Sequence, residues 1–184
     1  TFDLGSAKVE ILGPVKEYDD TNDTSIVLRI DYGSTSFLFT GDMEAGAERD
    51  LIDAGANLKA TVLKAGHHGS ITSSSYVFLR EVMPQYVVIS VGEDNSYGHP
   101  SEEVLSRYRD VKAEVYRTDL QGNIVARSDG ETVTFTTQTT PQWPTNPTEG
   151  QQPSQQLDRP AYIGNAGTMK FHKPDCGSAK AISE

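Results

Sequence analysis

The sequence predicts an α/β (α+β) domain in which helices pack on a mixed β-sheet. Strand-like runs rich in Val, Ile and Phe alternate with helix-like segments up to residue 137, which is typical of domains that combine a sheet with helices. At 184 residues, the chain is long enough for one such domain and a small second part. No apolar run approaches the ~20 residues that a membrane-spanning helix needs, so we expect no transmembrane segment in this chain.

The first part of the domain is predicted to be mostly strand. A strand is expected at 7–12, and strands at 26–32 and 35–40 form a hairpin around the turn at Gly33 and Ser34. Apolar residues alternate in the first hairpin strand, and we expect its buried face to carry Ile26, Leu28, Ile30 and Tyr32. The second hairpin strand is typical of one covered on both faces, because its apolar run is continuous at Phe37, Leu38 and Phe39.

Helices and strands alternate in the rest of the domain. The first predicted helix covers 43–54, with Asp42 in the N-cap position and Gly55 just past the end. Two more helices are predicted at 72–83 and 102–110. The remaining strands are expected at 58–65, 85–92, 113–118, 123–128 and 131–136, the last two joined through Asp129-Gly130. The order is therefore β-β-β-α-β-α-β-α-β-β-β.

The composition changes after residue 137. Residues 138–160 are rich in Pro, Gln and Thr, which predicts an extended, disordered linker, and 161–184 is too short to form a core of its own.

The formal net charge of -10 argues against a broad basic surface for nucleic acid, although bound cations would still permit a phosphodiester substrate. A single cysteine, Cys176, excludes an internal disulfide framework.

Three polar clusters stand where predicted strands end: Gly41-Asp42, His67-His68-Gly69-Ser70, and Tyr97-Gly98-His99-Pro100. Loops at one end of such a sheet converge, so we expect these clusters to share one site. They contain three of the four histidines in the chain. Carboxylates and neutral imidazoles are good ligands for Zn, Mn or Fe, and a metal-bound water has a pKa of roughly 7.

Each cluster also has a structural interpretation. Asp42 is in place to cap a helix, which is the favoured explanation for that residue alone. The pair His67-His68 is compatible with a simple turn before a helix, and His99 with an exposed loop position. The occurrence of all three clusters at strand ends of one domain favours a shared site.

The quoted clusters carry a family resemblance over 6–136. This region resembles the C-terminal half of a metallo-β-lactamase-fold domain, and more narrowly the soluble domain of ComEC-type DNA-uptake competence proteins and their secreted single-domain relatives. The motifs that carry it are TSIVLRIDYGSTSFLFTGDMEAGAERDLI, VLKAGHHGS and VVISVGEDNSYGHPSEEVL. The resemblance implies half of an αββα sandwich, with a mixed sheet and helices on one face, beside a site for one or two divalent ions, Zn or Mn.

The resemblance also implies roles for individual residues. Asp42 would bind or bridge the metals, and either His67 or His68 would be a ligand. His99 would be a further ligand or a proton donor, and Asn22 and Ser70 would line the substrate cleft.

One departure from the family pattern limits these expectations. The principal metal motif of the family, HxHxDH or HxDxDH, belongs to the N-terminal half, and Thr1 follows the place where it would stand. We therefore expect the chain alone to bind metal weakly and to be inactive.

The C-terminal segment carries a second resemblance. YIGNAGTMKFHKPDCGSAKAI resembles the start of a small Ada-like metal-binding module, with His172 and Cys176 at matching positions. We read 161–184 as a truncated module of this kind, which favours an extracellular or cell-surface protein.

These expectations combine into a functional hypothesis with two alternatives. The hypothesis is a metal-dependent phosphodiesterase or nuclease acting on single-stranded DNA, with a membrane channel domain as a candidate partner in the parent protein. The first alternative is a metallohydrolase of esters or lactones, because one scaffold supports many chemistries. The second is a DNA-binding module without catalytic activity.

Overall fold

The computed structural model describes residues 1–148, 163–165 and 170–172. The chain divides into two compact units, Thr1–Asn146 and Pro147–Glu184. In the second unit, strand β10 (Ile163–Asn165) pairs antiparallel with β11 (Lys170–His172). Most of the predicted linker and Ada-like module, including Cys176, lies outside the described residues.

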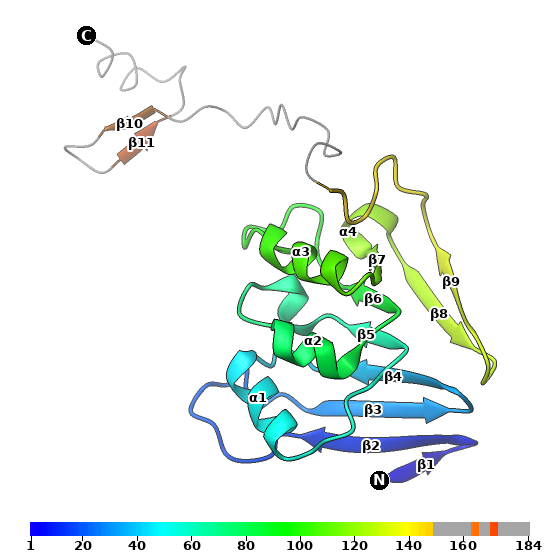
Figure 1. Ribbon diagram of the computed structural model, residues 1–184. Helices are drawn as coiled ribbons and strands as arrows, with labels where there is room; N and C mark the ends of the chain where they lie inside the picture. The colour runs from blue at the N-terminus through cyan, green and yellow to red at the C-terminus, as the bar shows by residue number, and fades with distance from the viewer. Residues whose placement is uncertain (149–162, 166–169, 173–184) are drawn as a thin grey trace. The chain divides into compact units, whose positions relative to one another are not determined.

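The first unit is built on a seven-stranded mixed sheet, which confirms the predicted fold class (Figure 1). Its strands lie side by side in chain order, antiparallel from β1 to β4 and parallel from β4 to β7. The strands are β1 (Phe2–Leu4), β2 (Ala7–Gly13), β3 (Val27–Tyr32), β4 (Thr35–Phe39), β5 (Val62–Lys64), β6 (Tyr86–Ile89) and β7 (Glu114–Arg117). The parallel half matters for function, because the carboxyl ends of β4, β5 and β6 meet at one edge.

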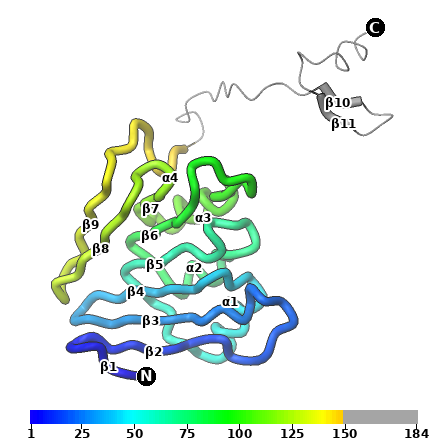
Figure 2. The backbone as a smooth tube through the Cα atoms, turned by 180° about the vertical axis from the view of Figure 1, so that it is seen from behind, coloured from blue at the N-terminus to red at the C-terminus, as the bar shows by residue number. Residues whose placement is uncertain are grey.

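Helices cover one face of this sheet, as the front and back views show (Figures 1 and 2). They are α1 (Ala45–Asp53), α2 (Tyr76–Val82) and α3 (Glu102–Asp110). Two further short helices were not predicted: the 3-10 helix at Gly66–Gly69, called η1, and α4 (Thr118–Gln121). Among the described residues, no helix has both the length and the apolar composition needed to cross a bilayer.

The main core lies between the sheet and the helices. Leu38, Leu63, Val87 and Val115 stand in register across β4 to β7, and all belong to the buried cluster. Leu38, Leu63 and Val87 are 0% exposed, and Leu79 of α2 is equally buried above the sheet.

The predicted buried face of β3 is wrong. Val27 and Arg29 are buried at 1% and 7% exposure, whereas Ile26 is 62% exposed. The register pairs Arg29 with Leu38, which places Arg29 on the helix side and turns its neighbours Leu28 and Ile30 to the other face. Arg29 tolerates burial because its guanidinium forms a two-pronged salt bridge with Asp31.

The starts of two helices also differ from the prediction. The N-cap of α1 is Glu44 rather than Asp42, and it makes no side-chain cap. Helix α2 begins at Tyr76, because the Ser75 hydroxyl accepts a hydrogen bond from the Phe78 N–H and caps the helix there. The preceding residues form turns and bends instead of helix, and the buried Glu48 carboxylate accepts the N–H groups of Ser74 and Ser75.

The second face of the sheet carries a separate hairpin. Strands β8 (Ile124–Ser128) and β9 (Val133–Thr137) pair antiparallel, as predicted, although their turn is longer than the Asp129-Gly130 signal implied. The Asp129 carboxylate accepts backbone N–H bonds from Glu131 and Thr132, which stabilises the longer turn. Phe135 of β9 stacks on Tyr116, with ring centroids 4.1 Å apart.

The first residues of the predicted linker contact the domain instead of extending away from it. Asn146 accepts a hydrogen bond from Arg109 of α3 and donates one to the Leu105 carbonyl. The Thr145 hydroxyl donates to the Val115 carbonyl of β7. Hydrogen bonds to α3 and β7 therefore order a segment whose composition gave no periodic signal.

Candidate functional site

The three polar clusters converge at the carboxyl ends of β4, β5 and β6. The His67 N–H donates to the Gly41 carbonyl at 3.0 Å, which joins the first two loops. The Ser101 N–H donates to the Gly69 carbonyl at 2.9 Å, which joins the second loop to the third. The three loops are thus connected by backbone hydrogen bonds as well as by their place in the sheet.

Two glycines allow this close approach. Gly41 has a φ of +56°, and a Cβ there would lie 2.7 Å from the Cβ of Ser25. Gly69 has a φ of +84°, and a Cβ there would lie 2.6 Å from Pro100. Any side chain at either position would strain the backbone. At Gly69 it would also separate the second and third loops, and at Gly41 it would displace Ser25 in the segment before β3.

His68 and Asp42 form the first donor pair. The His68 Nδ1 lies 2.7 Å from the Ser90 carbonyl oxygen, which requires a proton on Nδ1 and leaves the Nε2 lone pair free in the neutral ring. That Nε2 lies 3.6 Å from the Asp42 Oδ1. Both side chains are partly open to solvent, so a ligand can reach the pair.

His67 and Glu44 form the second donor pair. The His67 Nδ1 lies 3.4 Å from the Glu44 Oε1 but makes no hydrogen bond to any residue that the structure describes, although the nitrogen atom itself is buried. The Glu44 Oε1 already accepts hydrogen bonds from the Asn22 amide and the Thr72 hydroxyl. A buried ring nitrogen without a partner calls for an explanation, and a cation between imidazole and carboxylate would supply one.

His99 lies beside the second pair. Its ring centroid is 5.8 Å from that of His67, and Tyr97 stacks on its other side at 5.9 Å. Partial burial, followed by repulsion from His67 and His68, lowers the pKa of His99. This favours the neutral imidazole that a metal ligand requires. Asn95 fixes the loop by hydrogen bonds to both backbone groups of His99.

The histidine turn is held in an uncommon backbone conformation. His67 has φ, ψ of 44°, 45° and His68 has 55°, 23°, so two consecutive non-glycine residues are left-handed. Such residues cost about 1–3 kcal/mol each and cluster at functional sites. The strain orients two imidazoles into the site from adjacent positions.

Two further predicted residues lie at the margin. The Asn22 amide donates to Glu44, so it contacts the second donor pair directly. Ser70 is only 5% exposed, and its hydroxyl is bonded to Thr72 within the loop. Sequence reasoning missed Glu44, whose only signal was its position two residues after Asp42.

A partly buried cation lies next to the first donor pair. Lys64, the last residue of β5, donates to its neighbouring carbonyl, that of Ala65, and helps to line a pocket of about 210 Å³ with Phe37 and Phe39. Burial lowers the pKa of Lys64, and the charge of Asp42 opposes that shift. An ammonium group therefore stands close enough to the first donor pair to interact with its charge.

The donors fit a divalent cation in chemical type but only as part of a site. In the part of the chain that the structure describes, no group of three or more His, Cys, Asp or Glu side chains is arranged to hold a metal ion. The donors instead form two imidazole–carboxylate pairs, whereas catalytic zinc sites use three protein ligands. His67, His68, Asp42 and Glu44 thus account for some, and not all, of a ligand set.

Comparisons with known proteins identify the family of the chain. A family model described as the metallo-beta-lactamase superfamily matches residues 2–93, which includes both donor pairs and ends before His99. The chain is 47% identical over 104 residues to competence protein ComA of Neisseria gonorrhoeae and 38% identical over 114 residues to ComE operon protein 3 of Bacillus subtilis. It is 39% identical over 103 residues to recombination protein 2 of Haemophilus influenzae.

These matches cover 56%, 62% and 56% of this chain but only 15%, 15% and 13% of the respective relatives. The chain therefore corresponds to one part of much longer proteins. The family model covers half of the sequence and includes the loops that form the candidate site. The chain belongs to the metallo-β-lactamase superfamily, as a domain related to those of competence proteins.

Proposed function

We propose that this chain supplies part of the active site of a metal-dependent phosphodiesterase or nuclease that acts on single-stranded DNA. The observation that carries the proposal is the convergence of two imidazole–carboxylate pairs at the carboxyl edge of a superfamily domain. The superfamily supports a divalent metal, Zn or Mn, and the described residues supply only part of its ligand set.

The residues divide the work by position. Asp42 and His68 would hold the cation on the exposed side of the site, and the Ser90 carbonyl keeps the His68 ring oriented. His67 and Glu44 hold the buried side, with Asn22 and Thr72 fixing the Glu44 carboxylate. A bound Zn²⁺ or Mn²⁺ supplies Lewis acidity and lowers the pKa of a coordinated water from 15.7 to roughly 7.

In this proposal, His99 and Lys64 act on the substrate. His99 contributes a neutral imidazole as a further ligand or a proton-transfer group. Lys64 contributes a positive charge that compensates a phosphoryl group near Asp42. Ser70 stabilises its own loop, because its hydroxyl is already hydrogen-bonded to Thr72 in that loop.

The choice of DNA rests on the relatives. Their names refer to competence and recombination, which supports a nucleic-acid substrate over an ester or lactone. By the same comparison we propose an extracellular or cell-surface location and a membrane channel as the partner domain in the full protein.

The decisive experiment uses the full encoded protein and a labelled single-stranded oligonucleotide in Mn²⁺ or Zn²⁺. Wild-type protein should cleave it, and Asp42→Asn should lower the rate by about 100-fold or more. Asp53→Asn is the matched control, because Asp53 is an exposed acid of α1 paired with Arg49, and it should leave the rate unchanged.

Other outcomes separate the alternatives. Hydrolysis of a lactone without cleavage of DNA or bis-p-nitrophenyl phosphate would replace the nuclease by an ester or lactone hydrolase. DNA binding without turnover in either metal would make the domain a binding module. Equal rates for Asp42→Asn and Asp53→Asn would refute the proposed site.

A further inference from the structure

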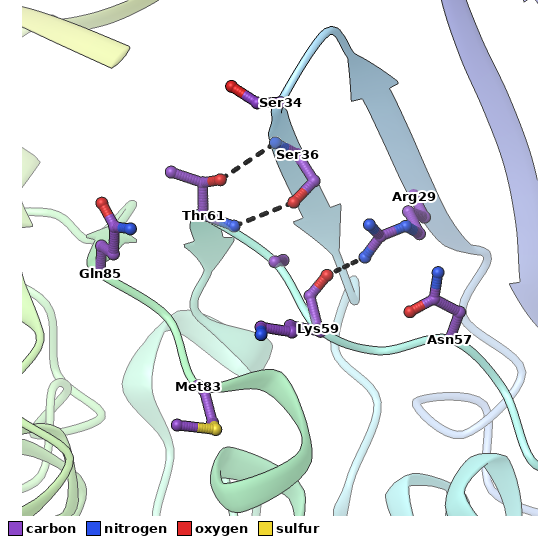
Figure 3. A pocket seen from close by; sticks show the side chains of 9 residues that line it. Arg29, Ser34, Ser36, Asn57, Lys59, Thr61, Met83 and Gln85 are labelled. Carbon is purple, nitrogen blue, oxygen red and sulfur yellow. Dashed lines mark hydrogen bonds between the residues drawn. The ribbon is translucent and has the colours of Figure 1, made fainter. Parts of the chain in front are cut away.

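A polar pocket of about 400 Å³ lies away from the candidate metal site, at the amino end of β5 (Figure 3). It is bordered by the β3–β4 turn, the segment before β5 and the end of α2. Its lining is polar apart from Ala60 and Met83, and it includes Arg29, Asn57, Lys59 and Gln85. A volume of this size is within the range of ligand-binding pockets.

The floor of this pocket is fixed by hydrogen bonds. The Ser36 and Thr61 residues exchange two of them, each hydroxyl accepting the other residue's N–H at 3.1 Å. Arg29, which is 7% exposed, donates to the Lys59 carbonyl and so holds the backbone of the pocket wall (Figure 3). A ligand would meet a wall that is already ordered, which lowers the entropic cost of binding.

The groups that remain for a ligand are donors. The side chains of Lys59, Asn57 and Gln85 have no hydrogen-bond or ion-pair partner among the described residues. The charge of Arg29 is compensated by Asp31, so the net positive charge of the pocket comes from Lys59. A free ammonium beside two amides suits an anion with several acceptor oxygens.

A second pocket of about 380 Å³ adjoins the first. The two share Met83 and Gln85, and the second adds Arg80 and Lys112 to its lining. No carboxylate side chain lines either pocket, in a chain whose net charge is -10. The nearest acidic groups along the chain, Asp31, Glu81, Asp110 and Glu114, belong to neither lining.

We propose that these two pockets form one groove for a row of phosphate groups, with Lys59 at one end and Arg80 and Lys112 at the other. The groove is distinct from the candidate metal site and goes beyond the proposed hydrolase function. Linear polyphosphate and the backbone of a single nucleic-acid strand share the required chemistry, which is successive anionic phosphates along a flexible chain.

The test measures binding by the complete 184-residue chain in EDTA, so that metal-dependent binding does not contribute. Tripolyphosphate and oligodeoxythymidylate are titrated separately by calorimetry. Lys59→Gln and Lys112→Gln should each weaken binding about threefold, and the double variant about tenfold. Lys16→Gln is the control, because it removes the same charge from an exposed residue paired with Asp50 of α1.

Each outcome bears on the proposal. Weakening of both ligands in the groove variants and not in Lys16→Gln supports a general phosphate site, and weakening of one ligand alone identifies its source. Absence of binding by wild-type protein, or equal weakening in Lys16→Gln, overturns the groove. Asp42→Asn should bind as wild type does, so failure of the nuclease proposal would leave this result unaffected.

Discussion

The two faces of the sheet differ in how completely they are covered. On the helix side, Leu38 is 0% exposed under α1 and α2, whereas its neighbour Phe39 on the other side is 39% exposed. Among the described residues, the second face is covered only by the β8–β9 hairpin, which leaves the pocket beside Lys64. Stability of the domain is therefore expected to reside on the helix side, while the second face has room for another layer.

The largest expected effect comes from shortening an apolar side chain on each face. Leu38→Ala should lower the free energy of unfolding by about 3 kcal/mol, because it leaves a cavity in the main core. Phe39→Ala should cost about 1 kcal/mol, since part of that ring is already in water. Urea denaturation of both variants measures the difference, and equal losses would show that the second face is as well packed as the first.

The next largest effect on the stability of the domain is expected at Glu48, a buried acid on the helix side. Glu48→Ala should destabilise the domain by about 2 kcal/mol, because two backbone N–H groups lose their acceptor. Burial raises the pKa of Glu48, so the folded protein binds more protons than the unfolded chain and the stability falls as pH rises above about 4.5. The variant should lack this decline, which unfolding curves between pH 4 and pH 7 would reveal, and an unchanged pH profile would contradict the assignment.

The hairpin should respond locally. Phe135→Ala removes the ring that stacks on Tyr116 and should cost about 1 kcal/mol. Hydrogen exchange should become faster in β8 and β9 and remain slow in β4 to β6, because the helices still cover those strands. Faster exchange throughout the sheet would mean that the hairpin supports the whole domain.

The smallest effect on the free energy of unfolding is expected at Lys64, where the substitution should stabilise the protein instead of destabilising it. Burial lowers its pKa, so the unfolded chain binds more protons and stability rises with pH toward 10.5. Lys64→Met should therefore stabilise the protein at pH 7 by up to about 1 kcal/mol and remove that rise. Thermal unfolding at pH 7 and pH 10 would check it, with destabilisation at pH 7 as the contrary result.

The order of elements and the meeting of the three loops could be predicted from the sequence. Strand and helix patterns alternated clearly, and parallel strands direct their carboxyl ends to one edge, so the placing of Asp42, His68 and His99 followed from chain order. The buried face of β3 was not predictable, because a prediction that follows the apolar residues places the charged Arg29 on the exposed face. Its burial depends on the pairing with Asp31 and on the register with β4.

The finer parts of the site depended on contacts between distant segments. Glu44 gains its importance from Asn22 and Thr72, which meet on one of its oxygens from different loops. The start of α2 depended on Glu48, which is remote from it in sequence. Such contacts are set by the tertiary structure and leave no local pattern.

The backbone bonds from His67 to Gly41 and from Ser101 to Gly69 have a consequence for engineering and for evolution. Exchanging one loop for that of a distant relative would leave a backbone N–H or carbonyl group of the neighbouring loop without its hydrogen-bond partner. Substrate preference at this edge should therefore change by concerted replacement of all three loops, and chimaeras that swap a single loop should express poorly.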